Sequence, residues 1–120
     1  MAPRSRPADC CATPHDPTEL AGSTRERLVA IYRALGDETR FEIFRLIAAQ
    51  DAPICVCDIV DRFDLTQPTI SYHLKLLREA GLVTVSQRGV WAYYTAAPEG
   101  LRLLKEASAV FTPARVGVLA

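Results

Sequence analysis

The sequence predicts a mainly α-helical domain with a β-hairpin, and three observations predict it. Four amphipathic segments, three of them with a capping residue at the start, occupy the first two thirds of the chain. Two segments of alternating apolar residues joined by a glycine-containing turn follow them, and one more amphipathic segment begins at a proline. A short helix and a longer one about three residues later, followed directly by a hairpin, form a winged helix-turn-helix.

The bulk composition indicates one globular domain. The 120 residues are 49% hydrophobic, which suffices for a modest core. No apolar run is long enough to cross a bilayer, and the N-terminus lacks the apolar middle of a signal peptide, so we expect a cytoplasmic protein with no membrane partner. Basic and acidic residues both total 14, so nucleic-acid binding would depend on a local basic surface rather than on net charge.

The two ends of the chain differ from its middle. Residues 1–17 contain four prolines and little apolar material, and we expect a mobile tail that carries Cys10 and Cys11. Residues 18–112 contain all the predicted helices and strands. Residues 113–120 are expected to form a loose C-terminal tail.

Capping residues and periodicity predict the first two helices. Residues 23–26 (STRE) have the form of a capping box, and apolar residues with helical spacing follow up to Gly36. Asp37 is expected to cap a second helix that runs to about Ala49. Its predicted inward face has three apolar residues: Phe41, Phe44 and Ile47.

The next two helices form the predicted helix-turn-helix. A short helix from about Cys55 to Phe63 is expected to bury Ile59, Val60 and Phe63. Thr66 is expected to cap a fourth helix that runs through Ala80 and ends at Gly81. Three apolar residues of this helix should face the core: Ile70, Leu74 and Leu77.

The hairpin and the last helix complete the prediction. Residues 82–87 and 90–94 alternate, and Arg88-Gly89 is expected to form the turn between them. Three aromatic residues are expected to brace this wing: Trp91, Tyr93 and Tyr94. Pro98 opens the last helix, whose spaced residues are Leu101, Leu104, Ser108 and Phe111.

The outer face of the fourth predicted helix favours DNA binding. Its polar residues suit base edges in a major groove, and they are Gln67, Thr69, Ser71 and Tyr72. Lys75 and Arg78 are expected to contact phosphates, and Arg88 the minor groove or the backbone. Residues 66–88 carry a local excess of two positive charges.

Two questions about this helix stay open. His73 is a further candidate DNA contact, although a half-buried, hydrogen-bonded histidine is the more common case. The helix as a whole has the pattern of an ordinary amphipathic core helix as well, and the hairpin that follows it favours the DNA-binding interpretation.

Four segments together resemble a known family. ALGDETRFEIFRLI, CVCDIV, LTQPTISYHLKLLREAGLV and GVWAYY are similar to the ArsR/SmtB family of metal- and metalloid-sensing bacterial repressors, over about residues 28–111. The resemblance implies a homodimer whose first and last helices form the interface, so that residues 18–112 serve DNA binding and dimerisation. It also implies a repressor that needs no cofactor to bind double-stranded operator DNA and leaves it when an inducer binds.

The cysteines are the candidate inducer ligands. CVCD at the third helix resembles the arsenite-sensing subgroup, which has a third cysteine where this chain has Val60. Thiolates select soft ions, and a helix N-terminus is expected to lower the pKa of Cys55 and Cys57. We therefore expect As(III), or Sb(III), to be held by Cys55, Cys57 and at least one of Cys10 and Cys11. In the alternative, Cys55 and Cys57 alone bind a methylated arsenical.

Several other functions remain as alternatives. Cadmium and lead also favour sulfur, and vicinal thiols oxidise easily, so a redox or persulfide sensor of the same fold is possible. His15 or all four cysteines would suit zinc, although CxC spacing is not typical of it. A winged helix that binds only proteins is a further alternative. We expect no enzyme, because the chain lacks both the C-x₅-R loop of thiol phosphatase-like reductases and a phosphate-binding glycine loop.

Overall fold

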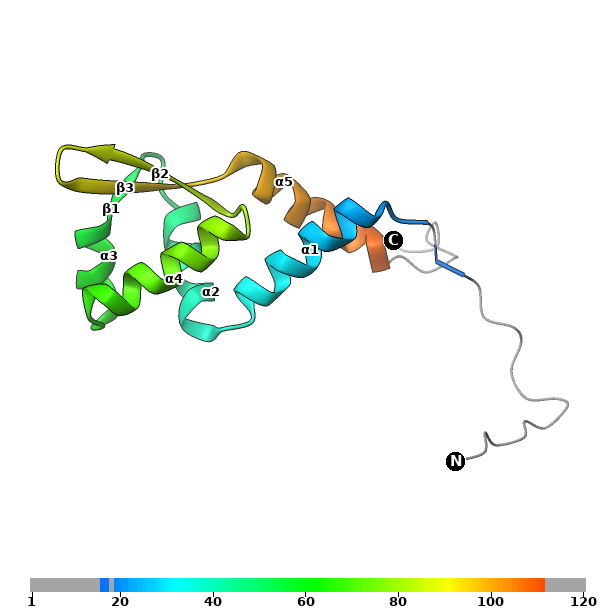
Figure 1. The fold of residues 1–120 in the computed structure, drawn as a ribbon, viewed down its shortest axis with the longest axis horizontal. Coiled ribbons are helices and arrows are strands. Elements are labelled where there is room, and N and C mark those ends of the chain that lie inside the picture. The colour runs from blue at the N-terminus through cyan, green and yellow to red at the C-terminus, as the bar shows by residue number, and fades with distance from the viewer. Residues whose placement is uncertain (1–15, 18, 112–120) are drawn as a thin grey trace, which may run out of the picture.

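The structure is a computed structural model that describes residues 16, 17 and 19–111. Its elements follow the order α1 (Gly22–Leu35), α2 (Glu38–Ala48), β1 (Ile54–Cys55), α3 (Val56–Phe63), α4 (Gln67–Glu79), β2 (Val83–Arg88), β3 (Trp91–Ala96), α5 (Pro98–Glu106) and the 3₁₀ helix η1 (Ala107–Phe111). In Figure 1 the sheet lies over α3 and α4 at one end, and α1 and α5 lie side by side at the other. The predicted winged helix-turn-helix is confirmed.

The sheet has one more strand than the sequence predicts. β1 pairs antiparallel with β3, which pairs antiparallel with β2, so the strand order is β1-β3-β2. Ile54 is the partner of Tyr94 and Cys55 is the partner of Tyr93. Two residues are too few to show an alternating pattern, so only the tertiary pairing defines β1.

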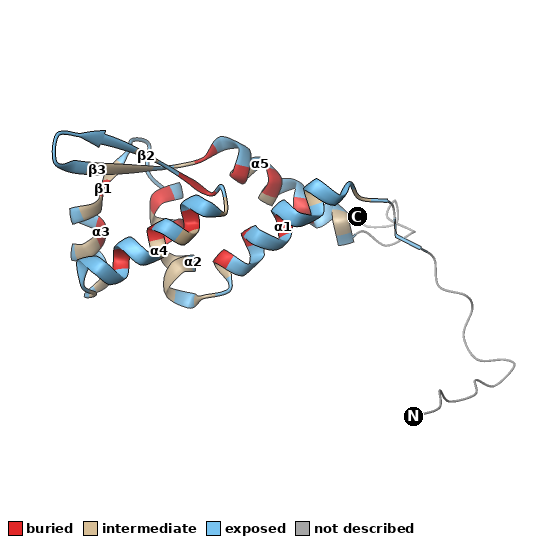
Figure 2. Cartoon of the chain, in the orientation of Figure 1, coloured by how far each residue is buried: buried red, intermediate tan, exposed pale blue. Residues whose placement is uncertain are grey.

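The core lies between the helices and the inner face of the sheet. Figure 2 shows the buried residues on the sides of α1, α4 and α5 that face one another. Six side chains from α2, α3, α4 and the start of the hairpin are fully buried: Ile43, Ile59, Ile70, Leu74, Leu77 and Leu82. The predicted inward face of α4 is therefore confirmed.

Both caps of the central helices are confirmed, but the predicted capping box of the first helix is wrong. The Asp37 carboxylate accepts a hydrogen bond from the Arg40 amide, and the Thr66 hydroxyl accepts one from the Thr69 amide. In contrast, α1 begins one residue before Ser23, and its cap residue Ala21 makes no side-chain hydrogen bond. The STRE sequence lies inside the helix.

One residue of α2 was assigned to the wrong face. Phe44 and Ile47 are buried as predicted, but Phe41 is 45% exposed and Ile43 is fully buried instead. Residues 43, 44 and 47 form one continuous stripe at helical spacing, and Phe41 lies beyond the edge of that stripe. The spacing of three between Phe41 and Phe44 alone does not distinguish the two faces.

The turn of the hairpin is shifted by one residue from the prediction. Arg88 is the last residue of β2 and pairs with Trp91, so the two turn residues are Gly89 and Val90. Gly89 has a φ of 63°, which a glycine adopts without strain. Val90 is 88% exposed at the tip of the wing.

The last helix packs only in part through the predicted residues, since Leu101 and Leu104 are half-buried against the core. Gly100, Leu103 and Ala107 are buried, whereas Ser108 is exposed and Phe111 is 74% exposed. The change to a 3₁₀ helix after Glu106 alters the number of residues per turn, so the 3.6-residue spacing fails there. Among the described helices, none has the length and hydropathy required to span a membrane.

Candidate functional site

The fourth helix presents its N-terminal turn to solvent. Its start is fixed by Thr66, whose hydroxyl lies 3.4 Å from the Thr69 amide nitrogen and donates to the Thr69 hydroxyl over 2.9 Å. Pro68 occupies the first turn, where its missing N–H costs no helical hydrogen bond. Because three leucine and isoleucine side chains hold the opposite face in the core, the helix is fixed in rotation about its axis.

The predicted DNA contacts of α4 lie together on its exposed side. Tyr72 is 58% exposed, and the other predicted contacts on this helix that are exposed are Gln67, Thr69, Ser71, Lys75 and Arg78. This set combines hydrogen-bonding groups near the helix start with two cations further along. A helix of this kind can place its first turns against base edges while the cations contact phosphates.

His73 differs from its neighbours because it is half-buried and hydrogen-bonded. Its Nδ1 lies 3.1 Å from a terminal guanidinium nitrogen of Arg40 on α2. Arginine only donates, so Nδ1 accepts and any proton of the neutral ring is on Nε2. The ring also lies at 5.8 Å, between centroids, from the ring of the exposed Tyr72. The sequence-based expectation of a half-buried, hydrogen-bonded histidine agrees with this geometry.

Arg40 is the residue of this region that the sequence analysis missed. Its Nε donates to the Ala34 carbonyl oxygen near the end of α1 at 2.5 Å, while the terminal nitrogen bonds His73 on α4. One side chain therefore connects α1, α2 and α4. In the sequence, Arg40 only follows two acidic residues at the start of the second helix, and this pattern does not indicate a contact 33 residues away.

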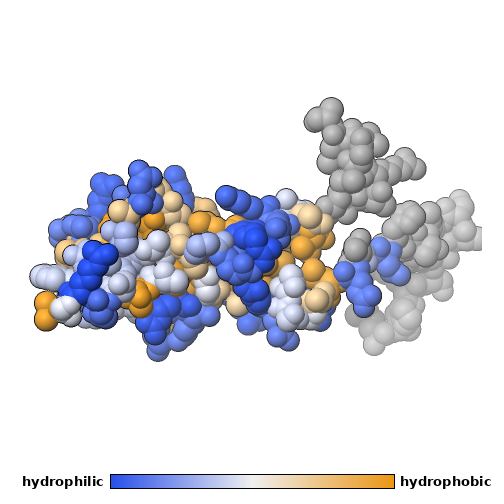
Figure 3. All heavy atoms as spheres, turned by 90° about the horizontal axis from the view of Figure 1, so that it is seen from above, coloured by the Kyte–Doolittle hydropathy of each residue, from blue (hydrophilic) through white to orange (hydrophobic). Residues whose placement is uncertain are grey.

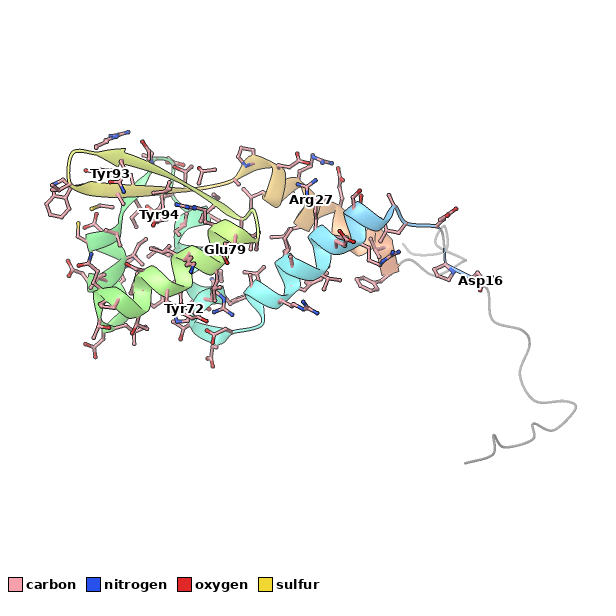
Figure 4. The ribbon with its side chains drawn as sticks, viewed as in Figure 1. Asp16, Arg27, Tyr72, Glu79, Tyr93 and Tyr94 are labelled. Atoms are coloured by element: carbon pink, nitrogen blue, oxygen red, sulfur yellow. The ribbon has the colours of Figure 1, made fainter. Side chains whose placement is uncertain are left out.

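On the wing, the guanidinium of Arg88 lies over the aromatic ring of Tyr93. The guanidinium carbon of Arg88 lies 4.8 Å from the centroid of the Tyr93 ring, which is cation–π geometry. Tyr94 packs against the core on the other face of β3, whereas Trp91 is 51% exposed. Figure 4 labels both tyrosines on the sheet. Tyr93 and Tyr94 thus brace the wing as predicted, whereas the more exposed Trp91 contributes less to its packing.

Cys55 and Cys57 bring their sulfur atoms together at the start of α3. Cys55 is the N-cap residue of α3 and is buried, while Cys57 in the first turn is exposed. The Cys57 thiol donates to the Cys55 sulfur, with 2.7 Å between the two sulfur atoms. The start of α3 therefore holds two candidate sulfur ligands side by side.

The expected lowering of the thiol pKa is wrong for Cys57. Its pKa is raised above the ordinary value, first because the thiol proton is shared with the Cys55 sulfur and then through partial desolvation. The negative charges of Cys55 and Asp58 act in the same direction, and together these effects exceed the lowering by the hydrogen bond from the Asp58 backbone amide. Cys57 therefore holds its proton at neutral pH.

The described part of the chain supplies two thiols to this place. In residues 16, 17 and 19–111, no group of three or more His, Cys, Asp or Glu side chains is arranged to hold a metal ion. Val60, at the position of the third cysteine in the family pattern, is half-buried. Cys10, Cys11 and His15 lie outside the described residues.

Comparison with known proteins identifies the family. Residues 37–85 match the family described as "Bacterial regulatory protein, arsR family". The chain is 42% identical over 69 residues to the uncharacterised HTH-type transcriptional regulator MJ1325 of Methanocaldococcus jannaschii, covering 58% of this chain and 76% of that protein. It is 43% identical over 63 residues to the arsenical resistance operon repressor of Bacillus subtilis, covering 52% of this chain and 59% of that protein.

A solved structure shares the fold. The homodimeric winged helix-turn-helix DNA-binding domain Mb0332 of Mycobacterium bovis aligns with a TM-score of 0.61 at 24% identity, covering 84% of this chain and 90% of that one. The exposed polar side of α4, the braced wing and these similarities agree with one another. The chain belongs to the arsR family of bacterial regulatory proteins and is a DNA-binding transcriptional regulator.

Proposed function

We propose that this regulator is a homodimeric repressor that releases its operator when trivalent arsenic binds Cys55 and Cys57. The observation that carries the proposal is the pair of sulfur atoms 2.7 Å apart at the start of α3, the helix directly ahead of α4. The similarity to a protein named as an arsenical resistance operon repressor supports the same inducer. Such a repressor acts in the cytoplasm, where bacterial DNA lies.

The donor set fits a soft, thiophilic ligand. Two thiols are adjacent, and hard cations such as Mg²⁺ prefer oxygen ligands. Arsenite forms As–S bonds with loss of one water per thiol, so the raised pKa of Cys57 is compatible with binding because no free thiolate has to accumulate. Antimonite follows the same chemistry. We assign the third sulfur ligand to Cys10 or Cys11.

The DNA contacts follow from the exposed side of α4. We propose that Gln67, Thr69, Ser71 and Tyr72 contact base edges in the major groove and that Lys75 and Arg78 contact phosphates. Arg88 on the wing contacts the neighbouring backbone or minor groove. His73 contacts DNA only through Nε2, because its Nδ1 is hydrogen-bonded to Arg40.

Dimerisation places two such helices on adjacent half-sites. We propose that α1 and α5 form the interface, since they contact each other and α1 exposes Val29 and Tyr32 at 42% and 43%. Figure 3 shows hydrophobic residues on the surface toward the end of the molecule that these two helices form. An apolar surface of this kind is stabilised when a second subunit covers it.

Coupling between the two sites requires little energy. α3 packs against α4, so a change at the start of α3 is transmitted to the recognition helix by direct contact. A coupling free energy of roughly 1–3 kcal/mol changes operator affinity by one to two orders of magnitude. Operator DNA should weaken arsenite binding by the same factor.

A mobility-shift series with the upstream DNA of the protein's own gene tests the proposal. Arsenite should release the wild-type protein and should not release a Cys55→Ser/Cys57→Ser variant that binds the same DNA normally. The Cys10→Ser/Cys11→Ser variant should require more arsenite. Normal release of the Cys55→Ser/Cys57→Ser variant would refute the assignment of the site.

The closeness of two sulfurs also favours a second candidate, a ligand that needs only two thiols. Methylarsenite has one valence occupied by its methyl group, so Cys55 and Cys57 suffice for it. In that case the Cys10→Ser/Cys11→Ser variant responds to methylarsenite as the wild type does. Cadmium, lead and peroxide in separate lanes distinguish the metal and redox sensors of the same fold, and release by one of these alone would replace arsenic as the inducer.

A further inference from the structure

We propose that Tyr93 is a positioning residue that connects the Cys55–Cys57 pair to the wing, so that the inducer displaces Arg88 as well as the recognition helix. The inference rests on the proposed function, because it takes these two cysteines as the inducer ligands. It assigns to the same site a second route to the DNA, through the sheet instead of through α3 and α4.

The first step of this route is the strand register. Cys55 on β1 and Ser86 on β2 are both cross-strand partners of Tyr93 on β3, so the three residues form one row across the sheet. Directly opposite residues in antiparallel strands point to the same face, with Cβ atoms about 4.5–5.5 Å apart. The Tyr93 side chain therefore stands beside the buried Cys55.

The second step is the contact between Tyr93 and Arg88. Arg88 is on the same face as Tyr93, two residues along β2 from the partner Ser86, and its guanidinium carbon lies 4.8 Å from the ring centroid. The cation is otherwise exposed at the end of the strand. Its direction is therefore set by the ring beneath it.

The third step is the space that an inducer requires. The two sulfur atoms lie at 2.7 Å, and Cys55 is only 7% exposed. Cys55 is on the same face of the sheet as Tyr93, so we expect a ligand atom bound to both sulfurs to lie beside the Tyr93 ring. Because closely packed side chains have no room to compress, a shift of the Tyr93 ring is the expected response, and Arg88 then loses its support.

The other face of β3 provides a contrast. Tyr94, Ile54 and Val85 form the neighbouring row, and Tyr94 packs on the core. Thr95 lies on the same face as Tyr93 and is exposed, but its partner is Thr84 and it is two residues further from the wing tip. A Thr95→Val substitution is therefore a matched control for Tyr93→Leu.

The fluorescence of a tryptophan in the wing can report on the conformation of the wing. Trp91 is the single tryptophan of the sequence, it is the cross-strand partner of Arg88, and it is 51% exposed. Sodium arsenite is titrated into the full-length protein without DNA, with Trp91 emission and calorimetric heat recorded in parallel. We expect the emission to change in proportion to binding in the wild type and in Thr95→Val.

The Tyr93→Leu variant decides whether the ring transmits the change. It should bind arsenite as the wild type does, but its emission change should fall to about half or less. Binding with no emission change in the wild type, or an equal change in Tyr93→Leu, would overturn this inference and leave the proposed function intact. Absence of arsenite binding in the wild type would overturn the proposed function, and the relay with it.

Operator affinity without inducer gives an independent readout of the same contact. Tyr93→Leu and Arg88→Ala should each weaken operator binding, and the double variant should be no weaker than Arg88→Ala alone, because Tyr93 acts through Arg88. The loss from Tyr93→Leu is expected to be about two- to five-fold, the range of an exposed cation–π contact. Fully multiplicative losses would contradict the assigned role.

Discussion

At the scale of single residues, a few side chains each contact more than one structural element. Cys55 closes a β-strand, caps α3 and brings a thiol to Cys57. Arg40 bonds the last turn of α1 and a histidine of α4 at once. Such residues connect elements that are distant in sequence, so their substitution is expected to affect function more than their exposure suggests.

Asp37 gives a stability prediction with a defined pH dependence. Its pKa is lowered, first by the hydrogen bond from the Arg40 amide, so its contribution to stability is present above the ordinary Asp pKa and is lost as pH falls through the folded-state value. Asp37→Ala should reduce the free energy of unfolding by about 1 kcal/mol at pH 7. Asp37→Asn keeps the cap without the charge, so urea unfolding should show its difference from the wild type shrinking as the pH falls below the ordinary Asp pKa. A constant difference would contradict the electrostatic part.

Arg40 gives a prediction about DNA specificity. Lysine keeps the charge but cannot bond both Ala34 and His73, so Arg40→Lys should weaken operator binding about five-fold, the equivalent of one hydrogen bond. Binding to unrelated DNA should change less, because Arg40 is not on the exposed side of α4. Fluorescence anisotropy with both DNAs measures this ratio. Arg45→Lys on the exposed side of α2 is the control, and an equal loss on both DNAs would rule out a positioning role.

At the scale of elements, close packing rather than surface charge holds α5 in place. Arg27 of α1 and Glu99 of α5 form an ion pair at 3.5 Å, and Arg102 also pairs with Glu99 and with Glu106. All of these groups are about half exposed, so water and salt screen the pairs. The buried Leu103 and Ala107 and the close approach of Gly100 therefore contribute more.

Gly100 provides the test of this packing. A Cβ atom added there would lie 2.4 Å from the Gly81 carbonyl oxygen in the turn between α4 and β2. Gly100→Ala should therefore lower the free energy of unfolding by about 1–3 kcal/mol, although alanine favours helices. Urea unfolding measures the change, with the exposed Lys105→Ala as a control expected to alter stability little. A stabilised Gly100→Ala protein would show that α5 moves away easily.

At the scale of the whole molecule, the proposed repressor works only as a dimer. One α4 reaches a single half-site, and two joined by α1 and α5 reach both. Three apolar side chains are exposed in the single subunit, and we expect the second subunit to cover them: Val29 and Tyr32 on α1 and Phe111 at the end of η1. Operator affinity should therefore depend on protein concentration wherever the dimer dissociates.

Tyr32→Glu tests the assembly. A charge in an apolar interface is costly, so this variant should sediment as a monomer and lose operator binding at concentrations where the wild type is fully bound. Ala52→Glu introduces the same charge in the exposed segment between α2 and β1, outside both proposed interface helices, and should change neither. A Tyr32→Glu protein that remains dimeric would exclude this surface from the interface.

The sequence by itself determined the order of the helices, the hairpin and the two central caps. Periodicity and capping are local properties, so Ile70, Leu74 and Leu77 could be assigned to the core, and Asp37 and Thr66 to caps, without knowledge of any neighbour. The exposed side of α4 follows from the same phase. These assignments are correct because the environment of each residue is determined by neighbours within a few helical turns.

Only the tertiary structure decided how distant segments meet. It defined β1 through its pairing with β3, joined Arg40 to His73, and placed Tyr93 between Cys55 and Arg88. It also reversed the expected pKa direction of Cys57, because the hydrogen bond to the Cys55 sulfur and the desolvation of the thiol raise that pKa. Each of these depends on the distance between atoms far apart in the chain or on the direction of a side chain, and a linear pattern carries neither.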